Sequence, residues 1–246
     1  MSRIALVTGA SSGIGRNAAV SLVKAGYTVV GTARSQEGLN ETASIAGEGF
    51  YGFAADVTDV VSVDKLFAEL ADKHGRLDVL FNNAGNALLS INFGDLELEQ
   101  FTGVLDVNTT GAFLVANRAY RLMRDQEPQG GRIINNGSIS AHAPRPGSAP
   151  YTVSKHAITG LTRSIALDGR AHNIACGQID IGNAASEMTD QISKGILQAD
   201  GSIKGESTMN VQHVGDAVVH MANLPLETNI LFMTVMATDM PFVGRG

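Results

Sequence analysis

The fold of this chain is decided by Ile4-Ala5-Leu6-Val7-Thr8-Gly9-Ala10-Ser11-Ser12-Gly13-Ile14-Gly15, an apolar run that leads into three closely spaced glycines. The apolar residues predict a buried strand, and a helical period begins within the glycine-rich part. Glycines allow a tight turn and let backbone N–H groups come close to a ligand. The unpaired N–H groups at the start of the helix carry partial positive charge, which suits a pyrophosphate. The residues of this turn that we expect to contact a nucleotide are Gly9, Ser11, Ser12, Gly13, Ile14 and Gly15.

The glycine spacing is G-x-x-x-G-x-G, which differs from the usual dinucleotide pattern G-x-G-x-x-G. No Gly-Lys-Ser/Thr follows, and this disfavours the phosphate loop of a nucleoside triphosphatase. The same pattern also occurs as an ordinary glycine-rich turn. Its position after the first strand and at the opening of the first helix favours dinucleotide binding.

Short apolar runs alternate with stretches of helical period along the chain. The strands that we predict are 4–7, 27–32, 50–54, 77–81, 132–136, 173–179 and 229–235. The predicted helices are 13–25, 35–46, 60–73, 97–125, 150–168 and 211–223. Continuous apolar strands separated by helices indicate a parallel sheet covered on both faces. We therefore expect a three-layer, doubly wound (Rossmann-like) α/β fold with a mostly parallel, seven-stranded sheet.

We expect residues 1–246 to form a single dinucleotide-binding and catalytic domain, because no linker, repeat or low-complexity segment divides them. Residues 183–210 depart from the alternating pattern, since they are polar, dotted with glycine and poor in β-branched runs. A long excursion of this kind in a compact domain is usually functional. We predict that it forms a lid over a substrate site.

The composition excludes several classes of partner. The chain has 246 residues, 44% of them hydrophobic and 17% charged, as a globular protein does. Its net charge of −6 argues against nucleic acid and anionic membranes, which call for basic patches. No apolar run approaches the ~18 residues that would span a bilayer. We see no signal-like segment before the first strand and expect a cytoplasmic protein.

No metal site is predicted. The six histidines show no pairing with carboxylates or cysteines at metal-ligand spacing. His142 lies between Ser138 and Tyr151, two polar residues that are discussed below, and we interpret it as a loop histidine. The single cysteine, Cys176, falls in an apolar strand and is more typical of a core residue than of a nucleophile.

Tyr151 and Lys155 are four residues apart on a predicted helix, so their side chains share one face. Pro150 suits the first helical position, which would put Tyr151 in the first turn. A tyrosine pKa of about 10 makes a poor base at neutral pH. We expect the Lys155 ammonium, the helix N-terminus and a cationic cofactor to lower it, and a shift to about 7 needs roughly 4 kcal/mol. Such a pair also occurs on many surface helices, so its spacing alone does not identify a site.

Three segments together resemble the short-chain dehydrogenase/reductase family, in its single-domain form with Tyr-x-x-x-Lys. They are the glycine-rich turn, Asn82-Asn83-Ala84-Gly85, and Tyr151-Thr152-Val153-Ser154-Lys155. Ser138 lies at the serine-to-tyrosine spacing of that family. The resemblance runs from Thr8 to at least Thr189, and the motifs agree in order as well as in spacing.

The resemblance implies a hydride exchange between a nicotinamide cofactor and a carbonyl or a secondary alcohol. In the family, Tyr151 would exchange the proton of the substrate oxygen, and Ser138 would hydrogen-bond the same oxygen. Lys155 would also hold the nicotinamide ribose, and Asn108 would anchor a water linked to Lys155. The cofactor contacts implied beyond the glycine-rich turn are Asp56 and Val57 at adenine, and Asn83, Ala84 and Gly85 beside its ribose. Family members are commonly tetramers, so a homo-oligomer, tetramer or dimer, is expected.

Two segments depart from the family pattern, and the first is Asn136-Gly137, which replaces the more usual apolar-Ser pair before Ser138. In the second, Ile181-Gly182 stands where many members have Pro-Gly. Aligned without gaps, Ala184 and Ser186 then take the positions near the nicotinamide carboxamide. Gly182 permits close approach and Ser186 keeps a hydroxyl, so we expect Gly182, Ala184 and Ser186 to be cofactor contacts.

The end of the second strand indicates which nicotinamide is preferred. A carboxylate there would bind the ribose 2′-hydroxyl and repel a 2′-phosphate. Ala33 occupies that position and Arg34 follows it. Because the forked guanidinium of arginine matches phosphate geometry, we expect NADP rather than NAD, with Arg34 as the contact. The small-molecule substrate itself is not specified by the sequence.

Two other functions stay open. A dehydratase, an epimerase or an enoyl reductase can use the same fold, although the Tyr–Lys spacing and the chain length disfavour the last two. A dinucleotide-sensing protein could keep the fold and lose the chemistry. Such proteins tend to lack the tyrosine or the lysine, and both are present here.

Overall fold

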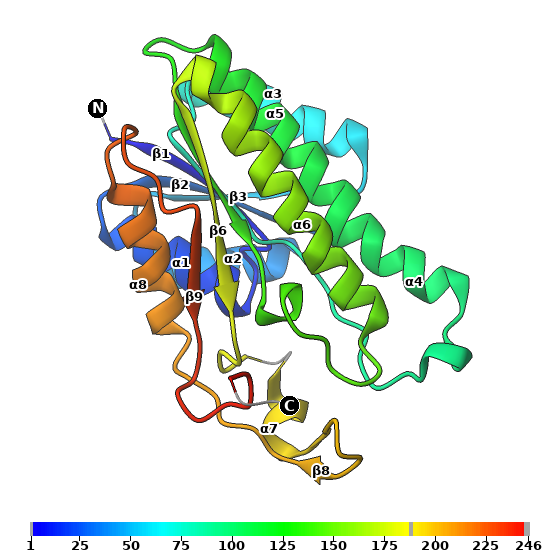
Figure 1. The fold of residues 1–246 in the computed structure, drawn as a ribbon. Helices are drawn as coiled ribbons and strands as arrows, with labels where there is room; N and C mark the ends of the chain where they lie inside the picture. Colours follow the sequence, from blue (N-terminus) through cyan, green and yellow to red (C-terminus); the bar gives the residue numbers. More distant parts are fainter. Residues whose placement is uncertain (1, 187–188, 244–246) are drawn as a thin grey trace.

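The computed structural model describes residues 2–186 and 189–243. Seven parallel strands form one sheet in the order β3-β2-β1-β4-β5-β6-β9 (Figure 1). The strands are β1 Ile4–Thr8, β2 Thr28–Ala33, β3 Phe50–Ala54, β4 Val79–Asn82, β5 Gly131–Asn136, β6 Ile174–Ile181 and β9 Phe232–Val235. The predicted doubly wound α/β fold with a parallel seven-stranded sheet is confirmed.

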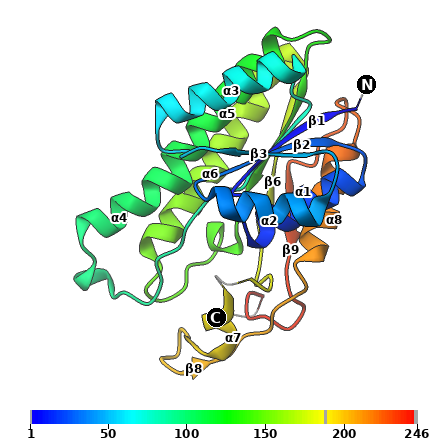
Figure 2. The same cartoon turned by 180° about the vertical axis from the view of Figure 1, so that it is seen from behind.

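Helices cover both faces of the sheet, as the two opposite views in Figures 1 and 2 show. One layer holds α1 Gly13–Lys24, α2 Gln36–Ala46 and α8 Gln212–Asn223. The other holds α3 Val60–His74, α4 Leu98–Leu105, α5 Ala112–Asp125 and α6 Ala149–Asp168. The central strands β1, β4, β5 and β6 are buried on both sides, which is why they read as apolar runs, whereas β3 at the edge is largely exposed.

Each strand supplies both cores, because successive side chains point to opposite faces of the sheet. In β1, Ala5 and Val7 join the core under α1 and α8, whereas Ile4 and Leu6 join the core under α3 and α5. The same alternation places Phe81 of β4 in the first core and its neighbour Leu80 in the second. The two cores fix the register of the sheet, because a slip by one residue would exchange them.

The strand order reverses between β1 and β4, and open α/β sheets bind ligands at this point. The two strand ends are tied together there. The Thr8 hydroxyl accepts hydrogen bonds of 2.8 Å from the backbone N–H groups of Asn83 and Ala84. The Asn83 side chain in turn donates to the Thr8 carbonyl oxygen at 2.8 Å. The glycine-rich turn and the Asn-Asn-Ala-Gly segment therefore form one rigid edge.

The structure differs from the sequence prediction in two places. The helix expected over 97–125 is interrupted by a π-helical segment, Asp106–Gly111, between α4 and α5. The stretch 183–210 holds a short helix, α7 Asp190–Lys194, and a two-stranded antiparallel ribbon of β7 Ile196–Leu197 and β8 Ile203–Lys204. Residues 187 and 188 of this stretch lie outside the described part. Figures 1 and 2 place α7 and β8 beyond the carboxyl ends of β6 and β9.

Candidate active site

The glycine-rich turn has the backbone geometry that its sequence predicts. Gly9 and Gly13 have φ of 68° and 51°, in the left-handed region that favours glycine. A side chain at Gly15 would overlap the Gly9 carbonyl oxygen. Helix α1 begins at Gly13, and the side chain of its N-cap residue, Ser12, makes no capping hydrogen bond. The N–H groups of the first turn therefore have no side-chain cap and suit an anionic ligand.

Arg16 holds this turn in place, and the sequence analysis missed it. Its guanidinium donates to the Ser11 carbonyl oxygen and to the Thr42 hydroxyl, the latter at 3.0 Å. It also forms an ion pair of 2.6 Å with Glu41 on α2. Helix α2 thus supports the phosphate turn from behind. The arginine directly follows the last glycine of the motif, but its partners on α2, Glu41 and Thr42, lie 25 and 26 residues away in the sequence.

At the adenine end, Asp56 follows β3. Its Oδ1 accepts hydrogen bonds from the N–H and the hydroxyl of Thr58, at 2.9 and 2.8 Å. These bonds, together with the charge of Arg34, hold the pKa of Asp56 below its usual value. Arg34 is exposed after β2, whereas Val57 is buried. Arg34 and Asp56 therefore lie close enough to act on one another at the edge of the sheet.

Ser138, Tyr151 and Lys155 come together at the carboxyl end of β5. Helix α6 begins at Ala149, with Pro150 in its first turn and Tyr151 next to it. The Lys155 ammonium lies 5.4 Å from the centre of the Tyr151 ring and donates to the Asn136 carbonyl oxygen at 2.8 Å. Ser138 is buried and lies beside the tyrosine hydroxyl. The i, i+4 spacing and the strand end thus place these three side chains at one site.

The charge balance at Tyr151 differs from the expectation. Loss of water around the phenol raises the pKa of Tyr151, while the Ser138 hydroxyl and the charge of Arg145 act to lower it. Burial also lowers the pKa of Lys155 to about 8. The residues of this chain therefore favour the protonated tyrosine, because desolvation outweighs the charges that face it. The lowering expected from Lys155, the helix N-terminus and a bound cationic cofactor together stays a prediction, because this upward shift belongs to the protein alone.

Asn108 is buried in the π-helical segment and bonds Ser154, the neighbour of Lys155 on α6. Its side-chain amide donates to the Asn86 carbonyl oxygen and to the Ser154 hydroxyl, at 2.9 and 3.1 Å. Its Oδ1 accepts from the Asn86 N–H at 2.8 Å. Both amide hydrogens are thus used within the protein, and Asn108 joins the segment after β4 to α6. π-Helical turns are frequent at functional sites.

The segment after β6 meets the phosphate turn at one residue. A side chain at Gly13 would come within 3.6 Å of Ser186, so Ser186 lies over the turn. Ala184 packs in the core with only 1% of its surface exposed, and its N–H and carbonyl groups already bond Gly182 and Thr189. A side chain at Gly182 would overlap Met240 and Met236. The close approach that Gly182 allows is to the C-terminal segment.

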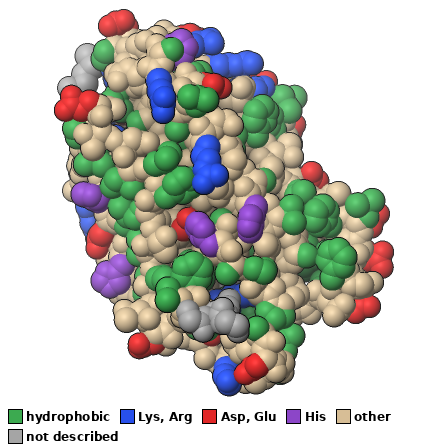
Figure 3. Space-filling model, in the orientation of Figure 1, with side chains coloured by type: hydrophobic (Ala, Val, Ile, Leu, Met, Phe, Trp, Pro, Cys, Tyr) green, Lys and Arg blue, Asp and Glu red, His purple; other side chains and the backbone are tan. Residues whose placement is uncertain are grey.

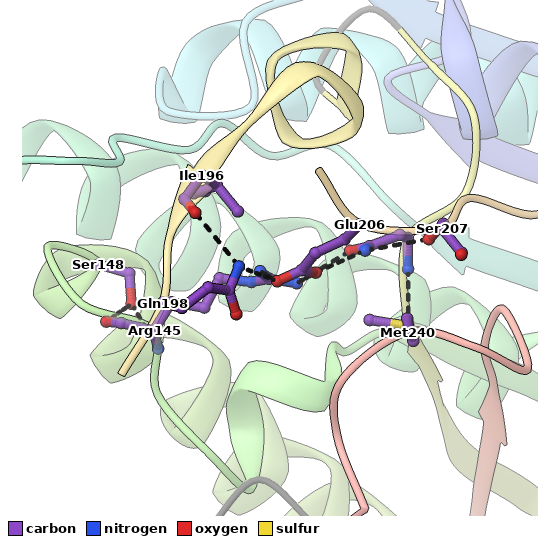
Figure 4. Close-up of polar contacts among 8 residues, drawn as sticks. Arg145, Ser148, Ile196, Gln198, Glu206, Ser207 and Met240 are labelled. Carbon is purple, nitrogen blue, oxygen red and sulfur yellow. Dashed lines mark hydrogen bonds and ion pairs between the residues drawn. The ribbon is translucent and has the colours of Figure 1, made fainter. Parts of the chain in front are cut away.

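A buried ion pair ties this segment to the loop before Tyr151 (Figure 4). Arg145 binds Glu206 through both guanidinium nitrogens, and their side chains are 7% and 1% exposed. Asn183 accepts from Arg145 at 3.0 Å and donates to Glu206 at 2.8 Å, and Gln198 donates to Glu206 at 3.0 Å. Burial raises the pKa of Glu206, but these hydrogen bonds outweigh it and the net shift is downward. We call these four residues, Arg145, Asn183, Gln198 and Glu206, the clamp.

Comparison with known proteins decides the family. Residues 3–196 match the family model described as short chain dehydrogenase. The chain belongs to the short-chain dehydrogenase family. A 3beta-hydroxysteroid dehydrogenase of Mediterraneibacter gnavus is 36% identical over 79% of this chain and 70% of its own. The serine 3-dehydrogenase of Agrobacterium fabrum is 30% identical over 99% of this chain and 97% of its own.

Solved structures agree with this assignment. The acetoin dehydrogenase YohF of Salmonella typhimurium is 31% identical, with a TM-score of 0.82 over 96% of this chain and 95% of its own. A 3-ketoacyl-(acyl-carrier-protein) reductase of Brucella melitensis, complexed with NADH, has a TM-score of 0.84 at 23% identity over 96% of this chain and 97% of its own, a likeness in fold. This short-chain dehydrogenase is accordingly an NAD(P)-dependent oxidoreductase that acts on CH–OH groups.

Two negative findings apply to the described residues, 2–186 and 189–243. None of the helices in this part of the chain is long and apolar enough to cross a membrane. Within the same ranges, no cluster of three or more histidine, cysteine or carboxylate side chains is arranged to hold a metal ion.

Proposed function

We propose that this short-chain dehydrogenase uses NADP(H) to interconvert a carbonyl compound and a secondary alcohol, with Tyr151 as the acid and base. The observation that carries the proposal is the grouping of Tyr151, Lys155 and Ser138 at the carboxyl end of β5. This grouping lies on the edge of the sheet where the phosphate turn also ends. Ketone- and alcohol-converting relatives, such as acetoin dehydrogenase YohF, support the same reaction class.

The residues of the chain fit a dinucleotide. The glycine-rich turn leaves room only for backbone at Gly15, and the first turn of α1 has no side-chain cap. In the proposal, Gly9, Ser11, Ser12, Gly13, Ile14 and Gly15 hold the pyrophosphate. Asp56, Val57, Asn83, Ala84 and Gly85 face the adenosine half, and Lys155, Gly182, Ala184 and Ser186 face the nicotinamide half. When bound, the reduced nicotinamide supplies the hydride.

The raised pKa of Tyr151 favours its role as a proton donor, in the direction of carbonyl reduction. A tyrosine that keeps its proton can donate it to a carbonyl oxygen that gains negative charge during reduction. Ser138 hydrogen-bonds the same oxygen and fixes its position. The Lys155 cation, held by the Asn136 carbonyl, stabilises the tyrosinate that remains. Asn108 steadies this end of α6 through Ser154.

A panel assay tests the proposal. The purified protein is mixed with NADPH and a series of ketones and aldehydes, and the loss of NADPH absorbance is followed. Turnover of at least one ketone is the expected result. Tight binding of NADPH without turnover of any panel member would contradict the enzyme and favour a dinucleotide sensor.

Replacing Arg34 by alanine is expected to raise the KM for NADPH about tenfold, a loss of about 1.4 kcal/mol. The exposed guanidinium after β2 would lose its contact with the 2′-phosphate, which NADH lacks. The KM for NADH should therefore stay within about twofold. Arg124→Ala removes another exposed arginine, which is paired with Asp125 on the far end of α5, and serves as the control. Equal losses for both cofactors would contradict the assignment of Arg34.

The rate of carbonyl reduction is expected to fall above about pH 8. The pKa of Lys155 is lowered to about 8, so its cation is lost as the pH rises through that value. Tyr151, with a raised pKa, stays protonated over the same range. The measurement is kcat/KM for reduction between pH 6 and pH 10, with a decline of roughly tenfold per unit on the alkaline side for one titrating group. In Lys155→Arg the residual activity should lack this decline, and a decline that persists there would exclude Lys155 as its source.

Four further proposals concern the protein as a whole. We place it in the cytoplasm as one catalytic domain, with residues 183–210 as the substrate lid, held by the clamp. We also propose a homo-oligomer, a dimer or a tetramer. Large apolar side chains are exposed on and around α4, α5 and α6, where Figure 3 shows hydrophobic groups gathered: Phe93, Leu98, Phe113 and Val153. Light scattering of the purified protein measures the mass, and a monomer would contradict this last proposal.

A further inference from the structure

A buried carboxylate lies beneath the proposed reaction site, and no step described above uses it. Asp180, near the end of β6, has only 1% of its side chain exposed. Its Oδ1 accepts hydrogen bonds from the Ser138 N–H at 3.0 Å and from the Gln178 side chain at 2.6 Å. Its Oδ2 accepts from Nε2 of His142 at 2.8 Å. A buried charge with three donors around it is well compensated, so this carboxylate has a defined structural position.

His142 connects this carboxylate to the solvent side of the site. It follows the short helical turn Ile139–Ala141, and 46% of its side chain is exposed. Because Nε2 faces a carboxylate, this nitrogen must carry the proton. The other ring nitrogen, Nδ1, has no hydrogen-bond partner among the described residues. The ring of Phe242 lies 6.3 Å away, centre to centre, and covers one flank of the imidazole.

Asp180 contacts the backbone of Ser138, one of the proposed reacting residues, in addition to His142. The carboxylate that orients the imidazole also fixes the backbone of Ser138, whose hydroxyl lies beside that of Tyr151. Its charge acts on both Tyr151 and Lys155. One side chain thus sets the position of Ser138 and of His142 relative to each other. The imidazole is therefore held on the same carboxylate as the Ser138 backbone, and Nδ1 is its remaining polar atom.

We propose that His142 binds a second polar group of the substrate, a hydroxyl within one or two carbons of the reacting carbon. This proposal rests on the proposed function and names its substrate class, the hydroxy ketones and the corresponding diols. Nδ1 of a neutral imidazole accepts a hydrogen bond and that of an imidazolium donates one. A hydroxyl can serve either form. His142 is then a specificity residue, and Asp180 is the positioning residue that orients it.

A substrate carboxylate suits the place beside His142 less well than a hydroxyl does. The Asp180 carboxylate lies directly behind the imidazole and would repel a second anion. Arg145, the cation of the loop that follows His142, is already bound to Glu206 and Asn183. Its charge is compensated within the clamp, so it does not offer an anion site. The surroundings thus favour a neutral hydroxy ketone over a keto acid.

The test compares three substrates of equal length with NADPH: hydroxyacetone, acetone and pyruvate. In the unmodified protein, kcat/KM should be highest for hydroxyacetone. His142→Phe should lower kcat/KM for hydroxyacetone at least tenfold, mostly through KM, while the value for acetone stays within about twofold. His142→Gln, which keeps a donor and an acceptor, should recover most of the preference. The matched control is His156→Phe, an exposed histidine that bonds the Thr152 carbonyl oxygen of its own helix.

The variant Asp180→Asn provides a second test of the proposed role of His142. The asparagine amide would donate to Nε2, so the proton of a neutral imidazole would move to Nδ1. Because a hydroxyl can also accept from Nδ1–H, the preference for hydroxyacetone over acetone should stay within about twofold in Asp180→Asn, and thermal unfolding checks that the variant folds. An unchanged preference in His142→Phe overturns the inference alone. Pyruvate reduced better than hydroxyacetone also overturns it. Reduction of none of the three, nor of any other ketone, overturns the proposed function and the inference with it.

Discussion

Replacing Tyr151 by phenylalanine is expected to lower kcat for carbonyl reduction by a factor of about 10² to 10⁴, the range for the loss of a positioned acid. The phenol is the protonated group beside Ser138, and burial raises its pKa so that the proton is retained. A phenylalanine ring fills the same space at the start of α6 but cannot donate a proton. The dissociation constant for NADPH should stay within about twofold, and the melting temperature should not fall.

A second tyrosine provides the matched control for this measurement. Tyr120 on α5 donates its hydroxyl hydrogen to the Asp168 carbonyl oxygen at 2.9 Å, far from the carboxyl end of β5. Tyr120→Phe should retain the activity of the unmodified protein. If Tyr151→Phe kept more than about a tenth of kcat, another group would have to supply the proton.

Glu206→Ala is expected to destabilise the protein by about 3–5 kcal/mol, the usual cost of an unpaired buried charge. The Glu206 carboxylate binds both guanidinium nitrogens of Arg145, and the two side chains are 1% and 7% exposed. Without it, the arginine would remain buried with Asn183 as its side-chain partner. For a chain of this length the melting temperature should fall on the order of 10 °C. Chemical unfolding measures the free energy directly.

Two further variants serve as controls for the effect of Glu206→Ala on stability. Asp200→Ala removes the acid of an exposed pair with Lys204 on the same ribbon, and should cost less than about 1 kcal/mol. The double variant Arg145→Met with Glu206→Met replaces the pair by apolar side chains and should recover most of the stability. If Glu206→Ala were as stable as Asp200→Ala, the ion pair would not hold the segment after β6 in place.

The sequence predicts the architecture because the relevant patterns are local. The central strands are buried on both faces, so each reads as an apolar run that ends in a polar or glycine-rich turn. The spacing of Tyr151 and Lys155 follows from the helical period, and the carboxyl ends of β1, β4 and β5 meet at one edge because the strands are parallel. The fold and the grouping of Ser138, Tyr151 and Lys155 are therefore readable from the chain.

The sequence does not reveal which polar residues far apart in the chain form hydrogen bonds or ion pairs with each other. Arg145 and Glu206 lie 61 residues apart, and His142 and Asp180 lie 38 apart. No local period connects such residues, and each is unremarkable in its own segment. An acid within an apolar strand, as at Asp180, is the one local signal of a buried pairing. The raised pKa of Tyr151 was missed for a related reason, since it depends on how much water the folded chain removes.

The interruption of the long helix by the π-helical segment is likewise a property of the packed structure. Gly111 packs closely against Val57, and Asn108 bonds both the segment after β4 and Ser154 of α6. Each of these contacts joins parts of the chain that are far apart in sequence. The helical period of 97–125 is compatible with an uninterrupted α-helix. A π-helical turn holds one residue more than an α-helical turn, and the sequence pattern does not show it.

The most direct test of the proposed reaction follows the hydride from the cofactor to the substrate as deuterium. The unmodified protein is incubated with hydroxyacetone and NADPH that carries deuterium at both hydrogen positions of C4 of the nicotinamide ring, and the product is analysed by mass spectrometry and NMR. The account predicts a diol with deuterium on the former carbonyl carbon, and loss of this product in Tyr151→Phe. Binding of the labelled cofactor without transfer of deuterium to hydroxyacetone or to any other carbonyl compound would contradict it.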